Sequence, residues 1–385
     1  MKKYIFLLGT TPKLSNAEVR SVFVGEDFEE LTENALQMTY DGEFDAEKVM
    51  SCLGGTVKIL EVRDELPKES TAEQLQTFLV GKLVDSGEAK IKLAVSEIGR
   101  NHLKSLDGIG IKRELIARGV KVRYIDGPRT GISAAILIHQ KTVQEWYFVE
   151  TKTKIVLAKT LVAQNIDEWT HRDRMKPYSD RRKGMLPPKL ARIMVNLALG
   201  RRIWDEDNQD LVLYDPFCGS GTVLMETAFY DLSLAGSDLD VKAVLGTGEN
   251  MDWLQAEYDL EVKTKLLTQD VSQVRPDALP DKVDFLVTEP FLGKPTPKQS
   301  ELAGIFRGLE KLYLGAFKNW TRLLRPGATL VVVLPTVKTD IRAHHLHGFL
   351  DKINALGYTR QSGDGFLYHR PNAVVQREIH VLRFK

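Results

Sequence analysis

A single segment of eight residues, 215–222, constrains the fold of this chain more than any other part of it. It follows a short apolar run at residues 211–214 and precedes residues 223–230, which contain neither Pro nor Gly. This order predicts a buried parallel strand, a tight Gly-x-Gly turn and a helix, with the turn at the carboxyl end of the strand. The segment consists of Asp215, Pro216, Phe217, Cys218, Gly219, Ser220, Gly221 and Thr222.

The turn alone is weak evidence of function, because many strand-to-helix loops contain Gly-x-Gly for conformational reasons. Leu224 stands where the dinucleotide fingerprint has its third glycine, which disfavours NAD. Backbone that approaches a ligand this closely suits an adenosyl cofactor lying across the carboxyl ends of the strands. The complete segment resembles the cofactor-binding motif of S-adenosylmethionine-dependent amino-methyltransferases, which methylate exocyclic nitrogens of nucleobases.

Length and composition indicate a soluble protein of two or three domains. Its 385 residues are 43% hydrophobic and 27% charged, which is typical of globular proteins. The formal charge of +1 excludes a global basic signature, so contacts with a polyanion must come from local patches. Cys52 and Cys218 form no metal-ligand spacing and predict no disulfide framework, which favours a cytoplasmic location. No segment approaches the length of a membrane span, so no membrane partner is expected.

The chain divides near residue 185, and the part that follows alternates between strands and helices. Residues 365–368 and 378–384 have the pattern of paired antiparallel strands. Repeated strand–helix units predict an α/β, Rossmann-like, doubly wound sheet with its ligand crevice at the carboxyl ends of the strands. Strands are expected at 233–237, 262–268, 283–288 and 328–334, and helices at 241–253 and 302–324.

The part before residue 185 has an α+β pattern without a long repeat. Residues 166–184 lack apolar periodicity and are rich in Arg, Lys and Asp, so we expect a linker or an ordered crossover there. Strands are expected at 90–95, 120–124, 133–139 and 155–158, and helices at 72–84 and 112–118.

Two strings before the cofactor segment are similar to one family. RDRMKP at 172–177 and GMLPPKLA at 184–191 resemble the segment that precedes the catalytic domain in the THUMP-containing tRNA guanine-N2-methyltransferases. These are the archaeal and eukaryotic enzymes that act on guanosine-10 of tRNA. Residues 7–15 resemble the N-terminus of the family. Its THUMP domain is similar to residues 96–103, 109–113 and 133–135.

The resemblance implies an activity, partners and a domain order. The activity is methyl transfer from S-adenosylmethionine to the exocyclic N2 of a guanine in tRNA, at guanosine-10. The partner is tRNA, and the assembly is either a monomer or a complex with an accessory protein subunit, as in eukaryotic relatives. The implied order is an N-terminal α+β subdomain at 1–55, a THUMP-like RNA-binding domain at 56–150, a basic linker at 151–184 and a Rossmann-like methyltransferase domain at 185–385.

By position, the resemblance assigns cofactor contacts to the whole segment 215–222. Asp238, at the end of the second strand, suits the ribose hydroxyls because a carboxylate accepts two hydrogen bonds there. Asp270, after the third strand, suits the adenine amino group. Asp240 is a further candidate, with the alternative that it caps the following helix. The residues expected around the methionine and ribose are Asp215, Gly219, Ser220 and Gly221.

The expected catalytic segment departs from its relatives. Amino-methyltransferases of this kind have Asp/Asn-Pro-Pro-Tyr/Phe after the fourth strand, whereas this chain has Thr288, Glu289, Pro290 and Phe291. Either Glu289 takes the place of the acid and Phe291 that of a proline, or Thr288 takes the first place and Phe291 the aromatic one. A carboxylate and a backbone carbonyl beside Pro290 could localise the lone pair of a guanine amino group and direct it at the sulfonium methyl carbon. Phe291 could stack on the extruded base.

Two other functions fit the same residues. One is a related enzyme that methylates another guanine or an adenine of RNA, and the other is a tRNA-binding protein whose catalytic loop has decayed. Carbon-5 pyrimidine methylation is disfavoured, because residues 288–293 contain no cysteine nucleophile. His344, His345 and His347 lack partner ligands, so no metal is expected.

Basic residues gather at 90–123 and 171–183. From charge alone, a solvated face is the ordinary interpretation. Beside a base-modifying domain these residues become candidate phosphate contacts, whose contribution falls steeply with salt. The candidates for RNA binding are Arg100, Lys112, Arg113, Arg172, Arg174 and Arg181.

Overall fold

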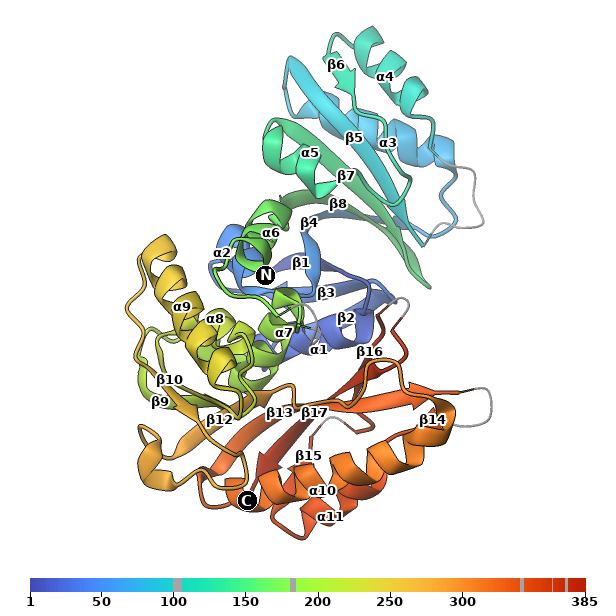
Figure 1. Cartoon of the computed structure of the whole chain (residues 1–385). Helices are drawn as coiled ribbons and strands as arrows, with labels where there is room; N and C mark the ends of the chain where they lie inside the picture. Colours follow the sequence, from blue (N-terminus) through green and yellow to red (C-terminus); the bar gives the residue numbers. More distant parts are fainter. Residues whose placement is uncertain (100–105, 181–184, 340–342, 362, 371–372) are drawn as a thin grey trace. The chain divides into compact units, whose positions relative to one another are not determined.

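The computed structural model describes the chain except residues 100–105, 181–184, 340–342, 362 and 371–372 (Figure 1). The chain forms two compact units. Unit 1 consists of Met1–Pro12 and Gly25–Glu168, and unit 2 of Lys13–Val24 and Trp169–Lys385. A short segment near the start of the chain therefore belongs to the same unit as the C-terminal part.

Unit 1 is built on an eight-stranded sheet. In spatial order its strands are β2 (Asp27–Thr32), β3 (Ala35–Tyr40), β1 (Lys2–Leu8), β4 (Thr56–Pro67), β8 (Lys154–Ala163), β7 (Val143–Glu150), β5 (Lys90–Ile98) and β6 (Lys121–Tyr124). Neighbouring strands are antiparallel, except that β5 runs parallel to both β7 and β6. The long strand β4 joins the two halves of the sheet.

Helices cover both faces of this sheet. Leu79 and Ile111 from α3 and α4 pack in one buried cluster with Leu93 of β5. Ala94, the next residue along β5, belongs to a different cluster, against which Ile136 of α5 packs. This division follows from the alternation of side chains along a strand. The helices of unit 1 are α2 (Ala46–Cys52), α3 (Ala72–Asp85), α4 (Gly108–Ala117) and α5 (Ala134–His139).

The prediction of a strand at residues 133–139 is wrong, because these residues form α5. An apolar run of this length does not distinguish a strand from a short helix by periodicity. Ala134 and Ala135 favour a helix, and Ser133 stands at the N-cap position with extended backbone. Part of the expected linker or crossover is also helical, since α6 spans Ile166–Arg174.

Unit 2 contains a nine-stranded sheet whose main path runs β11 (Thr264–Thr268), β10 (Leu232–Asp238), β9 (Asn208–Asp215), β12 (Val283–Thr288), β13 (Leu324–Lys338), β17 (Gln376–Phe384) and β15 (Tyr358–Arg360). The first five are parallel, and β17 is antiparallel to β13. β14 (Ala343–His344) pairs with β13, and β16 (Phe366–Tyr368) pairs antiparallel with β17 as predicted. The α/β, doubly wound fold class is confirmed.

Helices of unit 2 pack on the two faces of this sheet, with α8 and α9 on one side and α10 and α11 on the other (Figure 1). Apart from α1 (Pro12–Val22), they follow α6 along the chain. They are α7 (Pro188–Leu199), α8 (Thr222–Thr227), α9 (Val241–Tyr258), α10 (Leu302–Trp320) and α11 (His347–Asn354).

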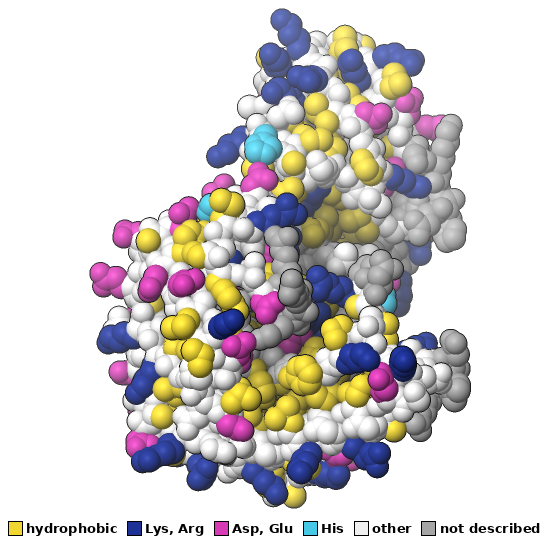
Figure 2. Space-filling model, in the orientation of Figure 1, with side chains coloured by type: hydrophobic (Ala, Val, Ile, Leu, Met, Phe, Trp, Pro, Cys, Tyr) yellow, Lys and Arg dark blue, Asp and Glu magenta, His cyan; other side chains and the backbone are white. Residues whose placement is uncertain are grey.

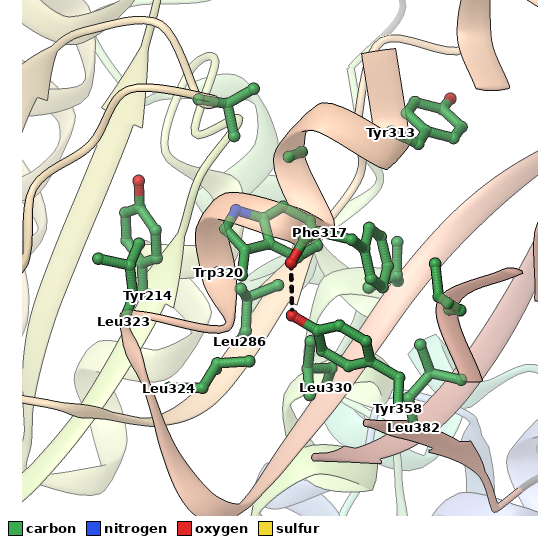
Figure 3. Close-up of a cluster of buried hydrophobic side chains, with 14 of the residues drawn as sticks. Tyr214, Leu286, Tyr313, Phe317, Trp320, Leu323, Leu324, Leu330, Tyr358 and Leu382 are labelled. Atoms are coloured by element: carbon green, nitrogen blue, oxygen red, sulfur yellow. Dashed lines mark hydrogen bonds between the residues drawn. The ribbon is translucent and has the colours of Figure 1, made fainter. Parts of the chain in front are cut away.

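The helical stripe predicted over residues 302–324 forms part of the main core of unit 2 (Figure 3). Phe317 and Trp320 of α10 are each about 1% exposed. The hydroxyl of Tyr358, on β15, donates a 2.8 Å hydrogen bond to the carbonyl of Phe317. A buried tyrosine hydroxyl needs such a partner, so this bond fixes α10 against the edge of the sheet.

Helix α1 is tied to α7 by buried polar contacts within unit 2. The side-chain amide of Asn196 donates a 2.7 Å hydrogen bond to the carboxylate of Glu18, and both residues are fully buried. Ser21 donates to the carbonyl of Asn196, at 3.2 Å. The indole of Trp204 donates to the carbonyl of Val22, at 2.8 Å. Because buried polar groups are costly to leave unpaired, these contacts make α1 a structural part of unit 2.

Within the described part of the chain, we find no helix with the length and apolar character needed to cross a membrane.

Candidate cofactor and catalytic site

The turn between β9 and α8 adopts a conformation that requires glycine. Gly219 and Gly221 have φ angles of +54° and +77°, which L side chains rarely adopt. A Cβ atom on Gly221 would lie 2.7 Å from Cγ2 of Thr247, on α9. Thr247 also donates a 2.9 Å hydrogen bond to the carbonyl of Gly219, and Asn250 donates one of 2.8 Å to the carbonyl of Ser220. Helix α9 therefore fixes the conformation of the turn through Thr247 and Asn250.

Asp215 ends β9 and is 2% exposed. Its Oδ1 accepts hydrogen bonds from the Thr288 hydroxyl, at 2.6 Å, and from the backbone N–H of Phe217, at 3.1 Å. Burial raises the pKa of Asp215 from 3.8 to about 7, although both hydrogen bonds act in the opposite direction. Asp215 is therefore poised to change its charge near neutral pH.

Asp238 ends β10, and its carboxylate is oriented by two backbone groups. Oδ2 accepts a 3.1 Å hydrogen bond from the N–H of Gly219, and Oδ1 accepts one of 2.9 Å from the N–H of Asp240. Asp240 caps α9, because its side chain accepts a hydrogen bond from the N–H of Lys242. Asp270 follows β11, and hydrogen bonds from Ser272 lower its pKa.

These carboxylates gather at one edge of the sheet. β11, β10 and β9 are neighbouring parallel strands, and Asp270, Asp238 and Asp215 stand at or just beyond their carboxyl ends. Ionised carboxylates only accept hydrogen bonds, so this edge suits a ligand rich in hydroxyl and amino donors and carrying positive charge. An adenosyl group with a sulfonium centre fits this set of acceptors.

The next strand in the sheet, β12, leads into the expected catalytic loop. Thr288 is fully buried and ends the strand. Glu289 forms a bidentate ion pair with Arg377 of β17, and one of its two contacts, from Nη2 to Oε2, measures 3.2 Å. Phe291 is 62% exposed, and its carbonyl accepts a 2.8 Å hydrogen bond from the hydroxyl of Tyr313.

The segment before α7 also contacts the glycine turn and its helix. Lys176 is 5% exposed, and its Nζ lies 3.5 Å from the hydroxyl of Thr222. Burial lowers the pKa of Lys176. The backbone of Tyr178 exchanges two hydrogen bonds with the side chain of Asn250, at 2.8 and 2.9 Å, and Asn250 in turn holds Ser220. Lys176 and Tyr178, which lie in the expected basic linker, thus pack directly on the candidate cofactor site.

Comparisons with known proteins agree with this geometry. Residues 178–345 match the UPF0020 family, described as RMKL-like, methyltransferase domain. The solved structure of TrmN from Thermus thermophilus aligns over 100% of both chains with a TM-score of 0.56 and 16% identity, a likeness of fold.

Two curated relatives carry names of one enzyme class. A tRNA (guanine(10)-N2)-dimethyltransferase of Methanothermobacter thermautotrophicus is 27% identical over 339 residues, which cover 87% of this chain and 89% of that protein. A protein of Methanothermococcus thermolithotrophicus, named "Probable tRNA (guanine(10)-N2)-dimethyltransferase", is 35% identical over 122 residues, which cover 31% of this chain and 70% of that protein. This chain belongs to the tRNA (guanine(10)-N2)-dimethyltransferase family.

Membership of this family confirms several predictions made from the sequence. The family itself, the enzyme class and S-adenosylmethionine as the cofactor are all as expected. The individual site residues remain predictions. Among the candidate cofactor residues, the structure brings Asp215, Asp238 and the turn at 215–222 together, whereas Asp240 serves as the helix cap that was its alternative role.

The candidate RNA contacts differ in their exposure to solvent. Figure 2 shows Lys and Arg side chains gathered over the part of unit 1 that carries β6 and α4. There Arg113 is exposed and Lys112 is half-buried, and Arg174 of α6 is also exposed. The expectation that Arg172 contacts RNA is not met, because this side chain is buried. Arg172 is 5% exposed, and its guanidinium pairs with Glu226 at 3.0 Å. Arg100 and Arg181 lie outside the described residues.

The sequence alone did not reveal four residues of the site. Arg377, Lys176, Thr247 and Asn250 hold the catalytic loop or the glycine turn, and none belongs to a recognisable motif of cofactor binding. Lys176 lies within the string RDRMKP, so the family resemblance pointed to its segment without assigning it a role. No sequence pattern distinguishes Arg377 as a site residue, since it is one of several basic residues in or beside the strand predicted near the end of the chain.

Proposed function

We propose that this chain transfers methyl groups from S-adenosylmethionine to the exocyclic N2 of guanosine-10 in tRNA. The observation that supports this most strongly is the placement of three carboxylates. They stand at the carboxyl ends of three consecutive neighbours in the sheet: Asp238 ends β10, Asp215 ends β9 and Glu289 directly follows β12. The first two flank the glycine turn, and the third begins the loop where the family resemblance places the Asp/Asn-Pro-Pro-Tyr/Phe segment.

The cofactor supplies an electrophilic methyl group on a sulfonium centre. In the proposed arrangement, Gly219, Ser220 and Gly221 line its methionine and ribose portion, since they form the turn at the carboxyl end of β9. Asp238 accepts hydrogen bonds from the ribose hydroxyls with the lone pairs that Gly219 and Asp240 leave available. Asp270 accepts from the adenine amino group.

The nucleophile is a poor one, because the lone pair of the guanine amino nitrogen is delocalised into the ring. Glu289 accepts one N–H of this amino group, and a backbone carbonyl beside Pro290 accepts the other. These two acceptors localise the lone pair and direct it at the methyl carbon. Phe291, whose ring is largely exposed, stacks on the extruded base.

Unit 1 is the proposed tRNA-binding part, with a THUMP-like domain at 56–150. The proposed phosphate contacts within the described residues are Lys112 and the exposed Arg113 of unit 1, together with the exposed Arg174 of unit 2. Within the described part of the chain, Cys52 and Cys218 form no disulfide, which is consistent with the proposed cytoplasmic location. The chain acts as a monomer or with an accessory protein subunit.

Tritiated-methyl incorporation into unmodified tRNA, followed by nucleoside mass spectrometry, tests the proposal. We expect N2-methylguanosine or N2,N2-dimethylguanosine, mapped to position 10 and formed only with S-adenosylmethionine. Methylation of another guanine or an adenine would instead favour the related enzyme. Cofactor and tRNA binding without any methyl transfer would favour a binding protein with a decayed loop.

A further inference from the structure

The ion pair between Glu289 and Arg377 is unusual in its burial and its position. The two side chains are 12% and 8% exposed. Nε and Nη2 of Arg377 each contact a different oxygen of the Glu289 carboxylate, so the pair is bidentate. Burying an ion pair carries a desolvation penalty that is offset only by good geometry and hydrogen bonding. This pair lies beside the carboxyl end of β12.

The sheet explains how Arg377 reaches the loop after β12. Thr288, the last residue of β12, lies opposite Val332 of β13. Arg377 of β17 lies opposite Pro335, three residues further along β13. Its guanidinium therefore extends past the end of β12, to the place where Glu289 begins the loop. The antiparallel strand β17 thus contributes a side chain to the same edge as the parallel strands.

We infer that Arg377 is a positioning residue for methyl transfer, which fixes the Glu289 carboxylate in the direction of the guanine amino group. The inference rests on the proposed function. Glutamate has one more rotatable bond than the Asp or Asn of the amino-methyltransferase motif Asp/Asn-Pro-Pro-Tyr/Phe, so its carboxylate is less well placed by the backbone alone. The guanidinium removes that freedom. Each carboxylate oxygen keeps a second lone pair, so the pair leaves acceptors for the substrate.

Other groups around Glu289 define its charge. Burial raises the pKa of Glu289, while the positive charges of Arg377 and of Arg370, in the segment before β17, act to lower it. On the other side, Glu289 acts on the carboxyl group of Asp215 and the hydroxyl of Tyr313, and it raises the pKa of each. Among the described residues, Arg377 makes the only bidentate contact with Glu289. Removing Arg377 should therefore affect the Glu289 carboxylate more directly than any other group.

Kinetics of the full-length chain on unmodified tRNA, measured across the neutral pH range, test the inference. We expect Arg377→Gln to lower kcat about 10- to 100-fold, because Glu289 is misplaced. The acidic limb of the pH profile should move upward by about one unit or more, because Glu289 loses the charge that favours its ionised form. Binding of S-adenosylhomocysteine should stay within about twofold of wild type, because the glycine turn is untouched.

Two further variants distinguish positioning from a purely structural role. In a Glu289→Gln background, Arg377→Gln should change kcat by less than about twofold, since its effect passes through Glu289. Arg377→Lys keeps the charge but loses the bidentate geometry, so kcat should fall while the acidic limb stays near its wild-type position. If Arg377→Gln does not fold, Arg377→Lys replaces it, and its effect on kcat is compared in the wild-type and Glu289→Gln backgrounds.

The control is Arg383→Gln, which removes a second arginine of β17 whose guanidinium bonds Thr329 at 2.9 Å, away from the loop. An unchanged pH profile in folded Arg377→Gln, or effects of Arg377→Gln and Glu289→Gln that simply multiply, would overturn the inference and leave the proposed function standing. A wild-type chain that binds S-adenosylhomocysteine and tRNA but forms no methylated guanosine would reject the proposed function, and the inference with it.

Discussion

Thr288 and Asp215 join two neighbouring strands at the candidate site through a 2.6 Å hydrogen bond from the threonine hydroxyl to the buried carboxyl group. The bond connects the residue that ends β12 with the residue that ends β9, and it couples the expected catalytic loop to the glycine turn. It also opposes the effect of burial on the pKa of Asp215.

Replacement of Thr288 by Val should weaken cofactor binding near neutral pH. Without the hydroxyl, the pKa of Asp215 rises above about 7, and a smaller fraction is ionised. We expect the affinity for S-adenosylhomocysteine to fall about tenfold at neutral pH, the value of one hydrogen bond to a charged group, and to recover partly at higher pH. Calorimetric titration at several pH values measures this, and Thr288→Ser, which keeps the hydroxyl, is the control. A pH-independent loss would contradict the explanation.

Asp215 should make the ligand-free protein less stable as the pH rises. Its pKa in the folded chain is raised from 3.8 to about 7, so the folded state binds this proton more tightly than the unfolded state. The resulting stability is complete below about pH 4 and is lost as the pH rises through about 7, with a total of up to about 4 kcal/mol. Asp215→Asn should remove this dependence and abolish cofactor binding. Urea unfolding of both proteins at about pH 5 and pH 8 measures the difference, and parallel pH dependences would rule it out.

Glu289→Ala should separate chemistry from cofactor binding. We expect kcat to fall at least about 100-fold, since a group that acts on the nucleophile is lost, while the affinity for S-adenosylhomocysteine changes little. Single-turnover methylation and a binding titration measure the two effects. Comparable loss of both would indicate that Glu289 supports the cofactor site instead.

Glu226 should be essential for the stability of unit 2. Its carboxylate pairs with Arg172 and Arg192, and all three side chains are 6% exposed or less. Glu226→Ala leaves two buried arginines without their partner, which should cost about 3–5 kcal/mol in the free energy of unfolding. The matched control is Asp277→Ala, which breaks an ion pair with Arg275 that is mostly exposed and should cost less than about 1 kcal/mol.

Arg172 and Arg113 should respond differently to substitution. Arg172→Gln should lower the unfolding free energy and leave the salt dependence of tRNA binding unchanged, because its guanidinium is buried beside Glu226. Arg113→Gln should leave stability unchanged and reduce the slope of log affinity against log salt by about one, as expected for the loss of one phosphate contact. A reduced slope for Arg172→Gln would restore it as an RNA contact.

The extent to which the sequence predicts this site depends on how far apart the interacting residues lie in the chain. The strand, turn and helix around residues 215–222 are local, so apolar runs and glycines were sufficient to predict them. Asp238 was predictable as the last residue of a neighbouring strand. The partner of Glu289 was not, because Arg377 lies 88 residues further along and reaches the loop only through the order of β12, β13 and β17.

Charge patterns were the least informative part of the sequence. Arg172 and Arg174 stand two residues apart in one helix, yet the first is buried in an ion pair and the second is exposed. Nothing local distinguishes them, since the difference is set by Glu226 in α8. A similar limit applied to residues 133–139, where a short apolar run fitted a strand and a helix equally well.

Helix α1 affects how the catalytic unit completes its folding during synthesis. Asn196, which binds the carboxylate of Glu18, is added to the growing chain 178 residues after Glu18. The inner face of α1 stays exposed until α7 has been synthesised. Unit 2 therefore cannot fold completely from its C-terminal segment alone. A recombinant fragment that begins at Trp169 would expose the surface of α7 that α1 covers, and we expect it to aggregate unless residues 13–24 are supplied as a separate peptide.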